Sequence, residues 1–139
     1  MRAKPALLIA LLLVACNHAE PKEAKIKAPD PCALIQATDG ESQGDENTVR
    51  RCVLHDSLGS TTIAIHVIDR DAIMGQYRNL PGNEPVSGLG DEAFWNNAIN
   101  QLTMRTNSGI VTIGFNTSGG AAEHKEAAIE LAKKIIAAL

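Results

Sequence analysis

The chain has 139 residues and a formal net charge of −3, from 13 basic and 16 acidic side chains. Its longest basic clusters are Arg50-Arg51 and Lys133-Lys134, which argues against binding to nucleic acid and against electrostatic docking on anionic lipid. With two Phe, one Tyr and one Trp, the chain has little material for a platform on which bases or sugars stack.

The first 15 residues have the organisation of an export signal. Residues 1–4 form a short basic head, and residues 6–15 are ten apolar residues in a row. Ten residues are too few to span a bilayer as a helix, which needs about 20. A buried core helix is also disfavoured, because the run has no polar face and the polar segment after it offers nothing to pack against. We therefore expect residues 1–15 to be a signal peptide that is cleaved off.

Cys16 stands at the end of this apolar run. The order Leu13-Val14-Ala15-Cys16 resembles the lipobox of bacterial lipoproteins, in which the signal is cut just before the cysteine and the sulfur carries a diacylglycerol. The resemblance implies that Cys16 is lipidated and anchors the protein in a membrane, since the family modification supplies several acyl chains and one alone holds a protein only marginally. The next residue is Asn17 and not an aspartate, which is similar to lipoproteins sent to the outer membrane. The implied location is the bacterial cell envelope, on the outer membrane and facing the periplasm.

Residues 16–29 are expected to be the acylated cysteine and a flexible tether. After Cys16 this segment is rich in charge, with two prolines and one large apolar residue, so it cannot bury enough apolar surface to order itself. Residues 30–139 then form one domain of ordinary size. Cleavage before Cys16 removes Arg2 and Lys4, which leaves 11 basic against 16 acidic side chains and a net charge of −5.

Two cysteines remain once Cys16 is assigned to lipid. Cys32 and Cys52 are an even number in an oxidising compartment, so a disulfide is expected. Closing a loop of about 20 residues would stabilise the fold by roughly 3 kcal/mol. The alternative is a pair of reduced thiols that bind a metal. It lacks support, because the chain has no Cys-x-x-Cys and His55 is the only histidine near either thiol in sequence.

The first half of the domain predicts a helix, two strands and a second helix. Asp30 as N-cap and Pro31 at the first helical position predict a short helix, and the acidic residues 40–47 that follow it predict a polar loop. Residues 48–56 and 60–69 predict two strands, of which the second is rich in β-branched residues. Residues 71–79 have apolar side chains at helical spacing, and the glycine and prolines of residues 81–85 break that helix.

The second half predicts three strands and a long helix. A short strand is expected over residues 93–96, and residues 101–106 and 110–116 alternate apolar and polar side chains on either side of a turn at 107–109. Residues 121–139 carry an apolar stripe at helical spacing, with Glu near the start and Lys near the end to suit the helix dipole. The domain is therefore predicted to be α+β, with an antiparallel sheet of about five strands packed by helices in the order α-β-β-α-β-β-β-α.

Three parts of this order resemble a group of uncharacterised small bacterial lipoproteins. They are the Asp-Pro-Cys that ends at Cys32, the single Cys52 in the first strand, and the Gly-Leu-Gly-Asp-Glu-Ala of residues 88–93. Small lipoproteins of this build are often similar in fold to PsbP, so the resemblance implies a PsbP-like fold. It also implies that Cys32 and Cys52 are bonded, and it implies no catalytic residue.

Two motifs that suggest ligand chemistry are better explained by structure. Residues 88–92 lack the Lys of a phosphate loop and the third glycine of a dinucleotide fingerprint, so a tight turn is expected there. His55 and His66 would lie on one face of the first hairpin if the hairpin turned in two residues at 58–59. They would then be four ladder positions apart, about 13 Å, which is too far for both to bind one zinc. No metal site and no cofactor are therefore predicted.

Asp91, Glu92 and Trp95 are the remaining candidates for a functional site. Asp91 and Glu92 are adjacent, so on a strand they would point to opposite faces, and the chain has no Gly-x-Ser-x-Gly. These observations disfavour an enzyme. Trp95 is either an exposed anchor for a protein partner, with the two acids beside it, or plain packing if helices cover both faces of the sheet.

Three hypotheses about function follow. The first is a lipid-anchored, non-enzymatic protein-binding module of the cell envelope, with inhibition of an envelope-targeted hydrolase, or immunity against a toxin, as the preferred specific role. The second is a carrier of a small apolar ligand, held between the sheet and the helix over 121–139 by Met104, Phe115 and Ile135. The third is a hydrolase, which would need a cleft that brings Asp91, Glu92 or His66 within reach of one another.

Overall fold

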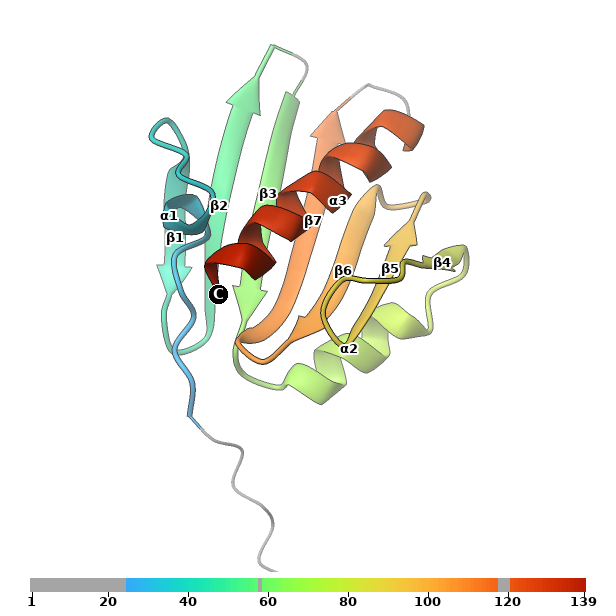
Figure 1. Ribbon diagram of the computed structural model, residues 1–139, viewed down its shortest axis with the longest axis horizontal. Helices are drawn as coiled ribbons and strands as arrows, with labels where there is room; N and C mark the ends of the chain where they lie inside the picture. Colours follow the sequence, from blue (N-terminus) through green and yellow to red (C-terminus); the bar gives the residue numbers. More distant parts are fainter. Residues whose placement is uncertain (1–24, 58, 118–120) are drawn as a thin grey trace, which may run out of the picture.

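One antiparallel sheet packed by helices forms the domain in the computed structural model, which describes residues 25–57, 59–117 and 121–139 (Figure 1). In these residues the sheet has seven strands in the order β1-β2-β3-β7-β6-β5-β4. The elements along the chain are α1 (Pro31–Leu34), β1 (Glu41–Asp45), β2 (Val49–Asp56), β3 (Gly59–His66), α2 (Arg70–Arg78), β4 (Asn83–Pro85), β5 (Glu92–Asn96), β6 (Gln101–Thr106), β7 (Gly109–Thr117) and α3 (Ala121–Ala138). None of the helices within the described ranges is both long enough and apolar enough to cross a membrane.

The predicted α+β class with an antiparallel sheet is confirmed, but the sheet has two strands more than expected. β1 lies in the predicted acidic loop and pairs along its whole length with β2, although all five of its residues are exposed. β4 lies in the predicted helix-breaking segment and pairs with β5 at the opposite edge. Neither strand has the alternation of apolar and polar residues by which strands are recognised in a sequence. An edge strand can lack this pattern, because the backbone hydrogen bonds to its neighbour hold it in the sheet.

The short helix α1 begins where its sequence predicts. The Asp30 carboxylate accepts a hydrogen bond from the Cys32 backbone N–H at 3.0 Å, and Pro31 occupies the first turn. The same carboxylate also accepts from the Ser42 hydroxyl at 2.8 Å and pairs with the Arg50 guanidinium at 3.1 Å. Asp30 thereby fixes a helix of one turn to both β1 and β2.

The main core lies between α3 and one face of the sheet. α3 crosses that face diagonally (Figure 1), and Ala128, Ala132 and Ile135 of its predicted apolar stripe are fully buried. Alternate residues of five neighbouring strands point toward α3. The strand residues on this side that have no exposed surface are Cys52, Ile63, Ile65, Val111, Ile113, Leu102 and Met104. The apolar stripe that the sequence predicts for α3 is therefore the face with which this helix covers the core.

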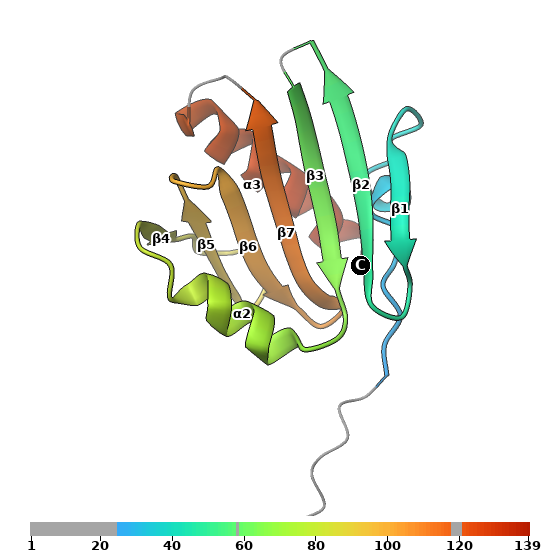
Figure 2. The same ribbon diagram turned by 180° about the vertical axis from the view of Figure 1, so that it is seen from behind.

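The reverse face of the sheet is covered only in part. α2 lies across the ends of the strands there (Figure 2), where Met74 packs with Phe94 and Ile110 in a second, smaller core. Asp69 is at the N-cap position of α2 with φ +48°, but its side chain makes no capping hydrogen bond. Asp71 instead pairs with Arg105 of β6 at 2.6 Å, which attaches the start of α2 to the sheet.

The predicted tether extends too far into the domain. Ala28 is 2% exposed, and its backbone N–H donates to the Glu46 carbonyl at 2.6 Å. Ile26 packs against the main core, and Lys27 pairs with the Glu46 carboxylate at 2.7 Å. The folded part therefore includes residues before 30, because Ile26 and Ala28 find partners that composition alone does not reveal. The predicted signal peptide and Cys16 lie outside the described residues.

The β2–β3 hairpin pairs in a different register from the predicted one. Asp56 pairs with Gly59 and His55 with Ser60, so the whole ladder is shifted by two residues. A shift of two keeps every side chain on its predicted face, and Cys52 and Ile63 share the core side as expected. His66 pairs with Val49, six ladder positions from His55, so the two imidazoles are about 20 Å apart along the strands.

The partly buried His66 predicts how stability responds to acid. Burial, and after it the positive charge of Arg51, lower the pKa of His66. The unfolded chain therefore binds the proton more readily than the folded one, and the free energy of unfolding should fall as the pH drops below the ordinary histidine pKa of about 6.5. Urea unfolding from pH 7 to pH 5 would measure the fall.

A substitution that removes the imidazole checks this prediction. His66→Gln should remove part of the acid-induced loss, because the glutamine amide does not titrate. An equal pH dependence in the parent and in His66→Gln would contradict the role given to His66.

Candidate functional site

The predicted disulfide between Cys32 and Cys52 is present. It joins α1 to β2 across 20 positions of sequence, and both half-cystines are buried in the main core. Gly40 lies against the bridge, since a Cβ at this position would stand 2.7 Å from each sulfur. The disulfide and the Asp30 cap together hold α1 in place, so the side chains that α1 presents to its surroundings are fixed.

Trp95 is a core residue and not an exposed anchor. It is 1% exposed on the α3 side of β5, with its ring 6.4 Å from that of Phe115 and its Nε1–H donated to the Asn97 side chain at 2.8 Å. Its neighbour Phe94 points to the reverse face and is buried under α2. Helices therefore cover both faces of β5, which makes packing the correct one of the two alternatives for Trp95.

Only one of the two acids beside Trp95 lies on a strand, because β5 begins at Glu92 and Asp91 precedes it. Glu92 points to the reverse face, where Arg78 of α2 donates two hydrogen bonds of 2.7 Å that lower the pKa of its carboxyl. Asp91 is exposed in the turn before β5. The glycines at 88 and 90 have φ of +81° and +59°, which confirms the predicted tight turn, and a Cβ at Gly90 would clash with the carbonyl oxygen of Arg105.

The residues named for the other two hypotheses are not gathered into a site. Met104 and Ile135, expected to line an apolar pocket, are fully buried in the main core. His66 and Glu92 stand in one row across the sheet, but β7 and β6 lie between them, which separates them by about 14 Å at the usual strand spacing. The described residues hold no group of three or more His, Cys, Asp and Glu side chains placed to bind a metal.

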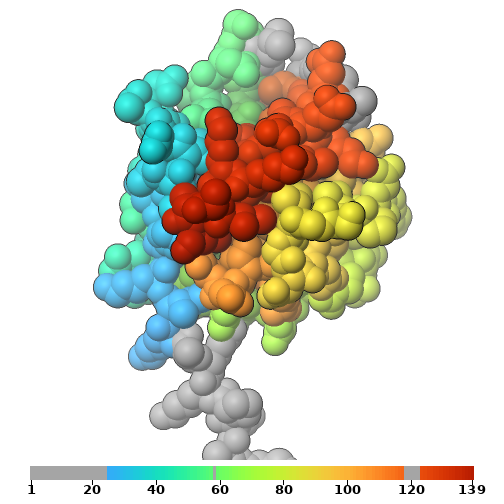
Figure 3. All heavy atoms as spheres, viewed as in Figure 1, coloured from blue at the N-terminus to red at the C-terminus, as the bar shows by residue number. Residues whose placement is uncertain are grey.

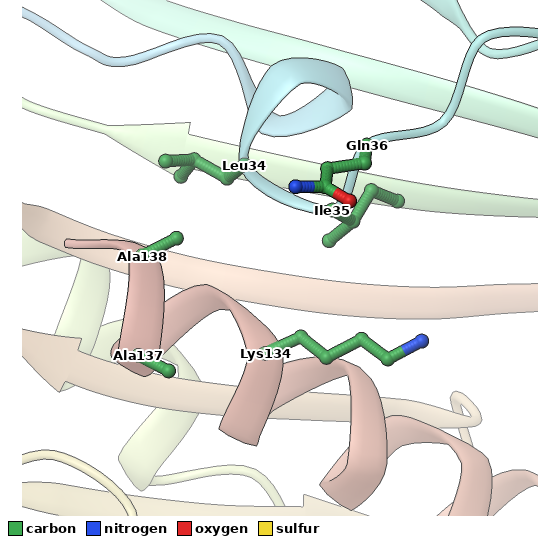
Figure 4. A pocket seen from close by; sticks show the side chains of 6 residues that line it. All are labelled: Leu34, Ile35, Gln36, Lys134, Ala137 and Ala138. Atoms are coloured by element: carbon green, nitrogen blue, oxygen red, sulfur yellow. The ribbon is translucent and has the colours of Figure 1, made fainter.

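Two pockets flank the C-terminal end of α3. One, of about 360 Å³, lies between α1 and α3 and is lined by Leu34, Ile35, Gln36, Lys134, Ala137 and Ala138 (Figure 4). The other, of about 280 Å³, lies on the opposite side of the helix and is lined by Gly90, Asp91, Thr106, Asn107, Ser108, Ile136 and Leu139. In Figure 3 the end of α3, in red, lies at the surface beside the blue and cyan segments that include α1. We call the two the α1 pocket and the turn pocket.

The two pockets differ in chemistry. The α1 pocket is apolar on both sides, with partly buried leucine and isoleucine from α1 facing exposed alanines of α3, and its polar groups are one amide and one ammonium. The turn pocket has hydroxyl, amide and carboxylate groups from the β6–β7 turn and Asp91. Leu139, which is 44% exposed, lines the turn pocket together with Ile136. Together the two pockets form a surface with hollows for apolar side chains and polar groups at its edges.

Sequence reasoning found only one residue of this surface. Asp91 was singled out for its acidity beside Trp95, and it does line the turn pocket. Leu34 and Ile35 carried no signal beyond a helix, and Lys134 was noted only for its effect on the helix dipole. Ala137 and Ala138 are ordinary helix residues whose small size leaves a hollow only because α1 packs nearby.

No family model, no curated protein and no solved structure matches this chain. The resemblance to small lipoproteins with a PsbP-like fold therefore stays a prediction.

Proposed function

We propose that this chain is a lipid-anchored protein of the bacterial cell envelope that acts by binding a protein partner and not by catalysis. The lipobox-like residues that end at Cys16 support the anchor, and the acidic balance of the chain argues against nucleic acid as the partner. Inhibition of an envelope-targeted hydrolase, or immunity against a toxin, is the specific role that best suits a small, disulfide-bonded domain of this kind.

The surface around the end of α3 is the observation that carries this proposal. Two hollows flank the end of α3, and the half-exposed Leu139 lines one of them. Their lining groups suit side-chain docking: aliphatic carbons, amides and hydroxyls, with Lys134 and Asp91 as the charged members. Protein interfaces are built in this way, from apolar anchors that enter hollows and a polar rim that excludes water.

The anchor is tested by changing the cysteine that would carry it. In cells expressing Cys16→Ser, the protein should move from the membrane fraction to the soluble fraction or remain as an uncleaved precursor, and it should no longer be labelled by a palmitate analogue. The parent protein is the reference for both measurements. A parent that takes up no label would contradict the anchor.

The interface is tested by filling the α1 pocket. Ala138→Arg places a long side chain in the hollow, so partner proteins that co-purify with the parent from detergent extract should be lost. Ala127→Arg is the matched control, because it is exposed on the same helix and lines neither pocket. Equal recovery with the two variants would remove the surface from consideration, and recovery of no partner by the parent would count against protein binding itself.

A further inference from the structure

Among the described residues Lys134 has no charged partner, in contrast to two other lysines of α3. On α3, Lys125 pairs with Glu84 at 2.8 Å and Lys133 with Glu130 at 3.1 Å. No ion pair or hydrogen bond involves Lys134 within the part of the chain that the structure describes. Its side chain runs along the α1 pocket (Figure 4), so an unpaired ammonium group lies at the edge of an apolar hollow.

Gln36 brings a second unpaired polar group to the same pocket. It follows the C-cap of α1 in the left-handed region, with φ +56°, as is common where a helix ends. Its backbone N–H donates to the Ala33 carbonyl and that of Ala37 to the Cys32 carbonyl, so the end of α1 fixes this conformation and leaves the Gln36 side chain at the pocket. Among the described residues no hydrogen bond involves the Gln36 amide, which is therefore free to bind a group in the pocket.

The two polar side chains of the pocket call for different groups in a ligand. The Gln36 amide offers both a donor and an acceptor, whereas the Lys134 ammonium offers donors only and suits an anion. The other lining residues are aliphatic. A ligand that fills the pocket should therefore supply an N–H donor, an anionic acceptor and an apolar group. A peptide segment with an acidic side chain does this, whereas a fatty acid offers no N–H donor.

We propose that the α1 pocket binds a short extended segment of the partner protein in which a large aliphatic side chain is next to an acidic one. The aliphatic side chain enters between Leu34 and Ile35 on one side and the two alanines of α3 on the other. The carboxylate pairs with the Lys134 ammonium, and backbone groups bond to the Gln36 amide. This inference rests on the proposed protein-binding function and adds the chemistry of the partner.

A random peptide library displayed on phage, selected on the purified full chain, tests the proposal. The parent should enrich peptides with an aliphatic residue beside Asp or Glu. Lys134→Met keeps the aliphatic stem and removes the charge, so it should keep the aliphatic preference, lose the acidic one, and bind the selected peptides roughly two- to fivefold more weakly, as expected for an exposed ion pair. Lys133→Met, the adjacent lysine with its own partner, should select and bind as the parent does.

The outcomes separate this inference from the proposed function. If Ala138→Arg abolishes partner capture but Lys134→Met leaves the acidic preference unchanged, the interface stands and the aliphatic–acidic motif is overturned. If neither variant affects a partner that the parent does capture, the surface itself is wrong. If native mass spectrometry shows dodecanoate bound in a Lys134-dependent way while no peptide is enriched, a fatty acid is the ligand and the peptide proposal fails.

Discussion

Replacing Cys32 and Cys52 together with alanine is expected to lower the free energy of unfolding by about 3 kcal/mol. The bridge closes a loop of 20 positions, and its loss lets the unfolded chain explore many more conformations. The folded state suffers as well, because α1 has only four residues and depends on the bridge and on Asp30 for its position. Urea unfolding followed by circular dichroism measures the change as a lower midpoint.

Two comparisons isolate the disulfide in this experiment. Ala33→Ser, at an exposed position of the same helix, should leave the midpoint within experimental error of the parent. A reducing agent should lower the midpoint of the parent toward that of the double variant and should leave the double variant unchanged. A parent that is insensitive to reduction, with a midpoint equal to that of the double variant, would show that the bridge does not stabilise the fold.

Trp95→Ala is expected to cost about 3–5 kcal/mol, the range for truncating a large buried aromatic side chain. The indole is 1% exposed between the sheet and α3, so its removal leaves a cavity that fixed strands on either side cannot close. It is the only tryptophan of the chain, so circular dichroism and not intrinsic fluorescence must follow the unfolding.

Ile99→Ala is the matched control for Trp95→Ala. Ile99 is another large apolar residue a short way along the chain, but it is 44% exposed, and its truncation should change the free energy of unfolding by no more than about 0.5 kcal/mol. The same small change in Trp95→Ala would mean that the indole lies at the surface. Trp95 would then again be a candidate for an exposed anchor that binds a protein partner.

Features that depend on a few residues adjacent in sequence were predictable. Asp30 and Pro31 mark the start of α1, the glycines at 88 and 90 mark a turn, and the strict alternation over residues 101–106 marks β6, since capping, positive φ and strand pleating each depend on a few neighbouring residues. The disulfide was predictable because the lipobox-like cysteine leaves only two others. The acylation of Cys16 also follows from sequence and stays a prediction.

Features that depend on partners distant in sequence were not predictable. β1 is polar throughout and is a strand only because β2 pairs with it, and Ala28 is buried only because the β1–β2 turn accepts its N–H. Alternation placed Trp95 and Phe94 on opposite faces of β5, but whether each face was covered depended on α2 and α3.

The α1 pocket combines both kinds of feature, because its helices are predictable from local sequence and their meeting is not. Leu34 and Ile35 near one end of the chain and Lys134, Ala137 and Ala138 near the other belong to helices that their own sequences predict. Their meeting depends on the Cys32–Cys52 bridge and on the packing of α3 across the sheet. A helix is determined by contacts within a few residues, whereas a pocket is the space left between two elements, and that space exists only once the whole sheet has placed both of them.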